Sequence, residues 1–135
     1  MAHLSWTDQM STGIAEQDEQ HKILIELINR LNDAIQERKD AEILSTVLTE
    51  LSYYAVHHFG YEEELMERHH YADTAAHKLE HRTFVEWMAG IKQKLDEEEA
   101  VVSAQVINFL RMWVTGHIMK TDRTMGQELS KIAQE

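Results

Sequence analysis

The sequence predicts an all-α protein: an up-down-up-down antiparallel four-helix bundle with an N-terminal arm and a short C-terminal helical tail. Proline is absent and glycine occurs only 5 times in 135 residues, so residues that interrupt helices are rare. Apolar residues recur at helical spacing in long stretches that short polar segments separate. Helices joined by short connections pack antiparallel to their sequence neighbours, which favours a simple bundle.

A mixed polar arm, residues 1–17, precedes the first helix and carries Trp6 and Ile14 as its apolar anchors. We expect Trp6 to pack onto the bundle. The first helix is expected from Asp18, a residue type suited to an N-cap, to about Arg38. Its apolar stripe consists of Leu24, Leu27, Ile28, Leu31 and Ile35.

Three further helices follow. The second is expected over residues 40–69, and the third begins after Asp73, another suitable N-cap. The third ends at the acidic run 96–99, which we interpret as a solvated turn because consecutive carboxylates on a turn diverge into water. The fourth is expected from near Ala100, with a weaker helical continuation after Asp122.

The length of the chain allows one hydrophobic core, so we expect a single domain over residues 1–135. Within it we expect the arm at 1–17, the four-helix bundle at about 18–119 and the C-terminal tail at 120–135. No helix shows an obvious second apolar stripe, which predicts a monomer.

The formal net charge of -11 would repel phosphate backbones and anionic surfaces, so nucleic acid is not an expected partner. The first twenty residues lack the pattern of a signal peptide, and no apolar run reaches the roughly 18 residues of a membrane span. We therefore expect a cytoplasmic protein without membrane insertion. Cysteine is absent, so any metal must be held by nitrogen and oxygen.

Histidine is unusually frequent, with 9 residues. His21 is in phase with the first stripe, His58 and Glu62 lie four residues apart, and so do His77 and His81. His117 follows the apolar residues of the fourth helix at helical steps. A single buried histidine is more often a hydrogen-bonded core residue than a ligand. A whole set of imidazoles and carboxylates facing an apolar core indicates a metal site, because unpaired buried polar groups are costly.

With Asp122 the candidate ligands are too many for one ion, so two ions sharing Glu62 and Asp122 are the natural partition. Nitrogen and oxygen donors suit iron, manganese or zinc. If three histidines serve one ion and two the other, the second ion keeps an open position. Asp122 fits least well, because it lies five positions after His117. The helix must therefore widen or break between Gly116 and Asp122.

The order and spacing of these residues resemble the hemerythrin signature. It comprises His21, the segment HFGYE ending at Glu62, the segment HKLEH ending at His81, and WVTGHIMKTD ending at Asp122. The opening EQDEQHK and Trp6 look like the bacterial single-domain type, bacteriohemerythrin. The resemblance covers nearly the whole chain.

The resemblance implies a cofactor of two non-haem iron ions, oxo- or hydroxo-bridged. His77, His81 and His117 would bind the saturated iron, His21 and His58 the open one, and Glu62 and Asp122 would bridge them. The implied function is reversible dioxygen binding for oxygen carriage, storage or delivery to an oxygen-consuming enzyme, without catalysis. The implied oxygen pocket is lined by Leu24, Phe59, Trp113, Val114 and Ile118. Val114 is smaller than the leucine expected there, and ordinary core packing explains these five residues equally well.

Other functions stay open at this point. One is an oxygen sensor that acts through a separate partner, and another is a diiron peroxidase or nitric-oxide-handling enzyme. Glu-rich ligand sets are typical of diiron enzymes, so the histidine-rich set favours reversible binding. A metal-free interaction bundle is the remaining alternative. The other histidines, expected at the surface or at helix ends, are His3, His57, His69 and His70.

Overall fold

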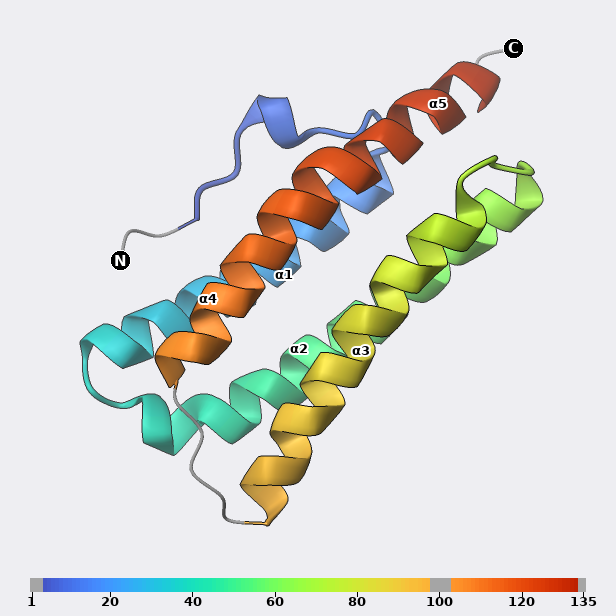
Figure 1. Ribbon diagram of the computed structural model, residues 1–135. Coiled ribbons are helices and arrows are strands. Elements are labelled where there is room, and N and C mark those ends of the chain that lie inside the picture. The colour runs from blue at the N-terminus through green and yellow to red at the C-terminus, as the bar shows by residue number, and fades with distance from the viewer. Residues whose placement is uncertain (1–3, 98–102, 134–135) are drawn as a thin grey trace.

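Figure 1 shows the computed structural model of the chain, which describes residues 4–97 and 103–133. The fold is all-α, as predicted. The α-helices are α1 (Ala15–Gln36), α2 (Asp40–Arg68), α3 (Thr74–Asp96), α4 (Ser103–Trp113) and α5 (Arg123–Ala133). A π-helix, Val114–Asp122, joins α4 to α5 without a break, so these three elements form the fourth rod of the bundle.

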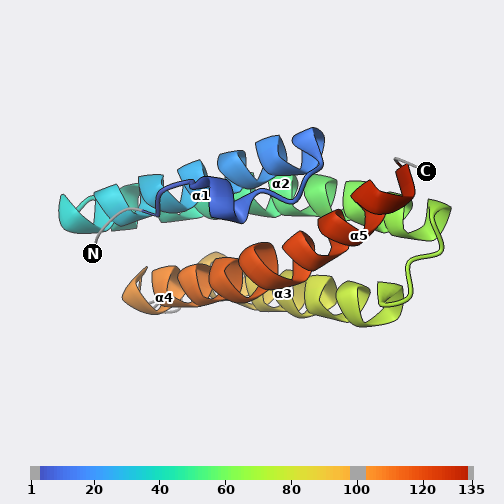
Figure 2. The same ribbon diagram turned by 90° about the horizontal axis from the view of Figure 1, so that it is seen from above.

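The helices form two layers, with α1 and α2 in one and α3 and the fourth rod in the other (Figure 2). Contacts run between α1 and α2, between α2 and α3, and between α1 and α4. Sequence neighbours are thus packed antiparallel, which confirms the predicted four-helix bundle.

The first helix begins at Ala15, three residues before the predicted N-cap at Asp18. The carboxylate of Asp18 instead accepts hydrogen bonds from the Ser11 hydroxyl at 2.7 Å and from the Thr12 backbone N–H at 2.8 Å. The residue that was expected to start the helix therefore fixes the arm to its first turn. The arm adds a short 3-10 helix, Asp8–Met10.

The turn between α2 and α3 relies on backbone conformation. α3 does start after Asp73, but the Asp73 side chain makes no capping hydrogen bond. His70 adopts a left-handed φ of 53°, and the Thr74 hydroxyl donates to the Tyr71 carbonyl at 2.6 Å. These two features reverse the chain within a few residues.

The predicted C-terminal helical tail corresponds to α5, and the fourth rod continues through it to Ala133. Met125 and Leu129 of α5 are buried and pack with Met66 of α2. The helical tail therefore packs against the bundle through α2. The predicted helix start at Ala100 and the second half of the acidic run lie outside the described residues.

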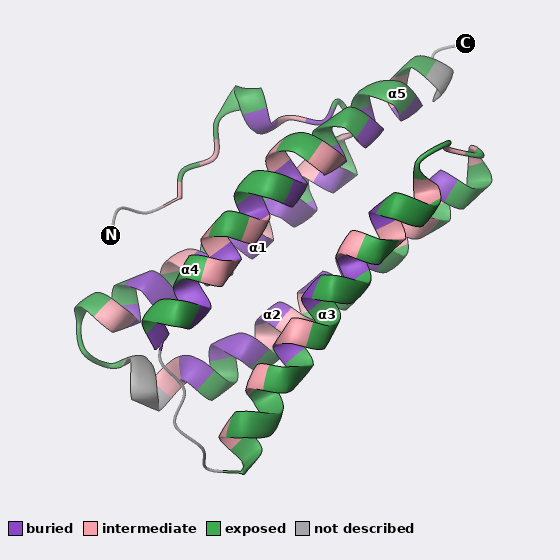
Figure 3. Ribbon diagram, in the orientation of Figure 1, coloured by how far each residue is buried: buried purple, intermediate pink, exposed green. Residues whose placement is uncertain are grey.

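Buried residues line the inside of every rod (Figure 3) and form two apolar clusters. The main cluster fills most of the bundle, and Trp6 of the arm packs against it as predicted. The second cluster consists of Met66, Met125 and Leu129, with Ile14, Leu65 and Tyr71 packed against them. No described helix combines the length and apolar character that a membrane span requires.

Candidate metal centre

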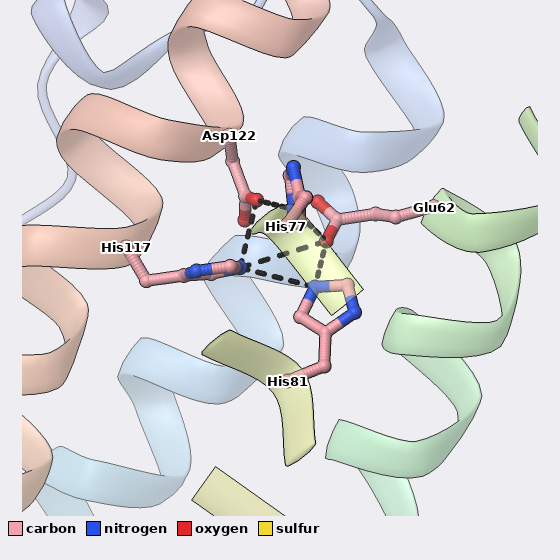
Figure 4. A group of neighbouring side chains, drawn as sticks. All are labelled: Glu62, His77, His81, His117 and Asp122. Carbon is pink, nitrogen blue, oxygen red and sulfur yellow. Dashed lines mark hydrogen bonds and ion pairs between the residues drawn. The ribbon is translucent and has the colours of Figure 1, made fainter. Parts of the chain in front are cut away.

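Every rod of the bundle brings polar side chains into the buried interior at one place, part of which is drawn in Figure 4. The residues are almost inaccessible to solvent, between 0% and 2% exposed. They are His21 of α1, His58 and Glu62 of α2, His77 and His81 of α3, and His117 and Asp122 of the π-helix. The structure thus brings together all seven predicted ligand residues.

Helix geometry explains how these side chains come to share faces. His58 and Glu62, four residues apart in a regular α-helix, point the same way. His117 and Asp122 lie five residues apart, and they share a face because the backbone between them is a π-helix, whose turns are wider. The predicted irregularity between Gly116 and Asp122 is confirmed.

Three histidines gather around one oxygen of each carboxylate, and we call them the three-histidine group: His77, His81 and His117. The Nε2 atoms of His77 and His117 lie 2.8 and 2.9 Å from Asp122 Oδ1. The Nε2 atom of His81 lies 2.9 Å from Glu62 Oε1. Figure 4 shows these rings pointing toward the two carboxylates.

The remaining two histidines, His21 and His58, face the other carboxylate oxygens and form the two-histidine group. The Nε2 atom of His21 lies 2.7 Å from Asp122 Oδ2, and that of His58 lies 3.1 Å from Glu62 Oε2. Each carboxylate therefore presents one oxygen to each group. Two carboxylates placed in this way could each bridge two cations.

The contacts fit a metal better than a network of hydrogen bonds. Asp122 Oδ1 is within 2.9 Å of two imidazole nitrogens, yet among the described residues it has no partner with hydrogen-bond geometry. Nε2 atoms also face each other, at 3.1 Å between His21 and His58 and at 3.2 Å between His81 and His117. Nitrogen and oxygen atoms whose lone pairs point toward one another in this way can bind cations that lie between them. A donor set of nitrogen and oxygen without sulfur suits iron, manganese or zinc.

The electrostatics of the centre favour positive charge. Burial alone would lower the pKa of His58 and of His77, but the carboxylates of Glu62 and Asp122 outweigh it and raise both values to about 9. Burial works to raise the pKa of Glu62, but its histidine neighbours hold it well below the usual range. The centre therefore attracts protons or metal ions, which compete for the same nitrogens.

Residues behind the ligands were not predicted from the sequence. Glu63 Oε2 lies 3.0 Å from His81 Nδ1, and Glu80 Oε1 lies 3.1 Å from His117 Nδ1. The Thr121 hydroxyl donates to Glu80 at 3.0 Å. The contact with His117 lowers the pKa of Glu80, although burial opposes it. Both glutamates thus lie within hydrogen-bond distance of the outer ring nitrogen of a candidate ligand.

Two glutamines complete this outer set. Gln20 Oε1 lies 2.7 Å from His58 Nδ1, and Gln17 donates from Nε2 to Glu62 Oε2 at 2.6 Å. Gln17 lies four residues before His21, so helical spacing could have placed it on the inner face. Glu63 and Glu80 carry no such signal, because their positions match those of solvent-exposed residues.

The residues of the predicted oxygen pocket lie in the core of the bundle. Phe59 stacks on His81 with ring centroids 4.0 Å apart, and the half-buried Trp113 stacks on His117 at 4.3 Å. Leu24, Val114 and Ile118 are buried in the main apolar cluster. Their role in oxygen binding stays a prediction.

The other described histidines do not join the centre. His57 and His70 are exposed, and His69 caps the C-terminal end of α2. These positions confirm the prediction of surface and helix-end sites, while His3 lies outside the described residues.

The comparison with known proteins agrees with this geometry. The Hemerythrin HHE cation binding domain family matches residues 12–129. A bacteriohemerythrin of Methylococcus capsulatus is 37% identical over 131 residues, which cover 96% of this chain and 99% of that protein. The chain belongs to the hemerythrin family. A bacteriohemerythrin of Pseudomonas aeruginosa is also 37% identical, over 90% of this hemerythrin and 78% of that protein.

Solved hemerythrin structures share the fold. A crystal structure of a wild-type hemerythrin superposes with a TM-score of 0.87 at 36% identity, and the match covers 96% of this chain and 99% of that one. The buried cluster of histidines and carboxylates therefore lies in a bundle of the hemerythrin type.

Proposed function

We propose that this hemerythrin binds dioxygen reversibly at two iron ions held by the buried centre. The observation that carries the proposal is the unequal division of the donors. Five residues, namely Glu62, His77, His81, His117 and Asp122, can offer one atom each to a first ion. Four residues, namely His21, His58, Glu62 and Asp122, can do so for a second.

This division leaves one metal position less filled than the other. Iron with such donors takes about six ligands. If one solvent-derived oxygen were shared by both ions, the first set would be complete and the second would be one ligand short. A diatomic ligand would then bind on the side of the two-histidine group. Iron supplies the electrons on which reversible dioxygen binding depends.

The protein surrounds the centre with buried side chains that exclude water. The candidate ligands are at most 2% exposed, and aromatic rings cover His81 and His117. Exclusion of bulk water protects a bound diatomic ligand from side reactions. The buried aliphatic residues Leu24, Val114 and Ile118 would line the oxygen pocket.

The test is an absorption spectrum of the purified protein with its iron quantified. The reduced protein is recorded under nitrogen, then in air, then after oxygen is removed. We expect about two irons per chain and a charge-transfer band that appears with oxygen and disappears on its removal. A band that forms but never reverses would contradict the proposal and favour a diiron enzyme or a sensor.

Oxygen carriage, storage or delivery to an oxygen-consuming enzyme would each use this reversible binding. A cytoplasmic location and a monomeric state stay predictions from the sequence.

A further inference from the structure

Two histidines of the three-histidine group, His81 and His117, have a glutamate carboxylate behind them, whereas the buried Nδ1 of His77 has no hydrogen-bond partner among the described residues. His81 and His117 turn Nε2 toward the centre, so Nδ1 is the atom that each presents to its outer neighbour. For His81 this neighbour is the Glu63 carboxylate at 3.0 Å, and for His117 it is the Glu80 carboxylate at 3.1 Å. A carboxylate that accepts the Nδ1 proton makes Nε2 a stronger donor to a metal ion.

The two-histidine group has a neutral side chain behind His58 and no hydrogen-bond partner behind His21 among the described residues. His58 Nδ1 faces the amide oxygen of Gln20 at 2.7 Å. His21 Nδ1 is buried, and no described residue forms a hydrogen bond with it. A neutral amide withdraws less of the Nδ1 proton than a carboxylate does, so Nε2 of His58 remains a weaker donor.

A third outer contact lies on the side of the two-histidine group. Gln17 is fully buried and donates to Glu62 Oε2 at 2.6 Å. This is the Glu62 oxygen that faces His58, at 3.1 Å from its Nε2. The contact fixes the orientation of the Glu62 carboxylate but adds no negative charge. The outer carboxylates thus contact histidines of the three-histidine group, whereas neutral amides make the outer contacts of the two-histidine group.

We propose that Glu63 and Glu80 make the two metal positions unequal, so that the three-histidine group binds its metal ion more tightly than the two-histidine group. The inference rests on the two-metal centre of the proposed function but not on oxygen binding. The glutamates act through His81 and His117 and are positioning residues. The more weakly held ion would be the one at the two-histidine group, which has fewer protein donors.

The test measures the binding of Co²⁺ to the metal-free protein by titration calorimetry. We expect two binding steps of different affinity. Glu63→Gln keeps an acceptor oxygen in place and removes the charge, and Glu80→Gln does the same behind His117. Each substitution should weaken the tighter step by about 10- to 100-fold and leave the weaker step nearly unchanged.

Glu64→Gln is the matched control, because Glu64 is the next residue on α2, its side chain is 71% exposed and its partner is Arg68. It removes the same charge without touching a candidate ligand, so both steps should stay unchanged. Circular dichroism checks that each variant keeps its helices.

A charge-neutral exchange provides the opposite change. Gln20 donates to Glu16 at 3.1 Å, so Glu16→Gln together with Gln20→Glu keeps this pair and places the carboxylate behind His58. This double variant should tighten the weaker step and bring the two affinities closer.

Two bound Co²⁺ ions with affinities that Glu63→Gln and Glu80→Gln leave unchanged, or weaken equally, would overturn the inference alone. A chain that binds no Co²⁺ would overturn the metal centre and the inference together. Two unequal steps in a protein whose iron form does not bind oxygen reversibly would support the inference and contradict the proposed function.

Discussion

Each histidine of the centre uses the same ring atom, because all five direct Nε2 toward the carboxylates of Glu62 and Asp122. This uniformity leaves Nδ1 available for contacts that hold the ring in place, as at His58 and His81. The helix thus sets the position of each donor, and an outer partner sets the orientation of its ring.

The ligand candidates were predictable and their outer partners were not, for a physical reason. A polar residue on an apolar stripe, such as His77, conflicts with its surroundings and is conspicuous in the sequence. A glutamate beside the stripe, such as Glu80, looks like any solvated residue until the neighbouring helix is in place. Its contact with His117 spans 37 residues, and no local pattern reports it.

Replacing both His77 and His81 by leucine tests the contribution of individual residues to the centre. The change removes two of the donors of the three-histidine group, so bound iron should fall from about two to below one per chain while the helices persist. The metal-free variant should resist urea less well than the metal-free parent, because the buried carboxylates of Glu62 and Asp122 lose two of their histidine partners. Elemental analysis and circular dichroism measure the two effects.

His57→Leu is the control, since His57 is exposed on α2 beside a candidate ligand. It should leave the iron content unchanged. Full retention of both irons in the double variant would refute the assigned ligand set.

Among the helices, the π-helix matters most for the centre. In a regular α-helix, side chains five positions apart point in different directions. The presence of both His117 and Asp122 in the interior therefore required a wider turn. The irregularity could be predicted from that conflict. The continuous passage into α5 could not, because the apolar pattern weakens after Asp122 and the burial of Met125 depends on Met66 of another helix.

Deletion of Lys120 tests the role of the π-helix. Lys120 is exposed, and its loss reduces the separation of His117 and Asp122 from five residues to four. Four residues in an α-helix and five in a π-helix each complete about one turn, so the segment should become α-helical and still bind iron. Iron content and the absorption spectrum report the outcome.

Deletion of the exposed Asn108 in α4 is the matched comparison. It rotates everything after it by about 100° relative to the first part of α4, which should disrupt either the core or the centre and release the iron. Equal iron binding by the two deletion variants would show that the π-helix has no special role.

At the scale of the whole molecule, the bundle places the centre among apolar residues from both of its clusters. Gln17 contacts both Glu62 of the centre and Met125 of the second cluster. The arm closes over the same region, because Thr12 is fully buried and Gly126 of α5 approaches it closely. The arm and α5 therefore depend on each other's position.

Gly126→Ala tests this packing. A Cβ at Gly126 would lie 2.5 Å from the Thr12 carbonyl oxygen and 3.0 Å from Gln17 Oε1, so atoms on both sides must shift. The variant should lose about 1–3 kcal/mol of unfolding free energy, measured by urea denaturation of the metal-free protein.

Gly90→Ala is the control, because nothing lies within 4 Å of the added Cβ in α3. It should gain up to about 1 kcal/mol through helix propensity. A Gly126→Ala protein as stable as the Gly90→Ala protein would contradict the close packing of arm and α5.

The contact between His21 and Asp122 joins residues 101 positions apart in the chain. With metal bound there, a force applied to the two termini would load this link first, and the arm and α5 would peel away outside it. The link shields the chain between its two ends, which would extend by roughly 330–360 Å in one event once the metal centre ruptures. The mechanical strength of the bundle would then be set by the coordination bonds rather than by its apolar core.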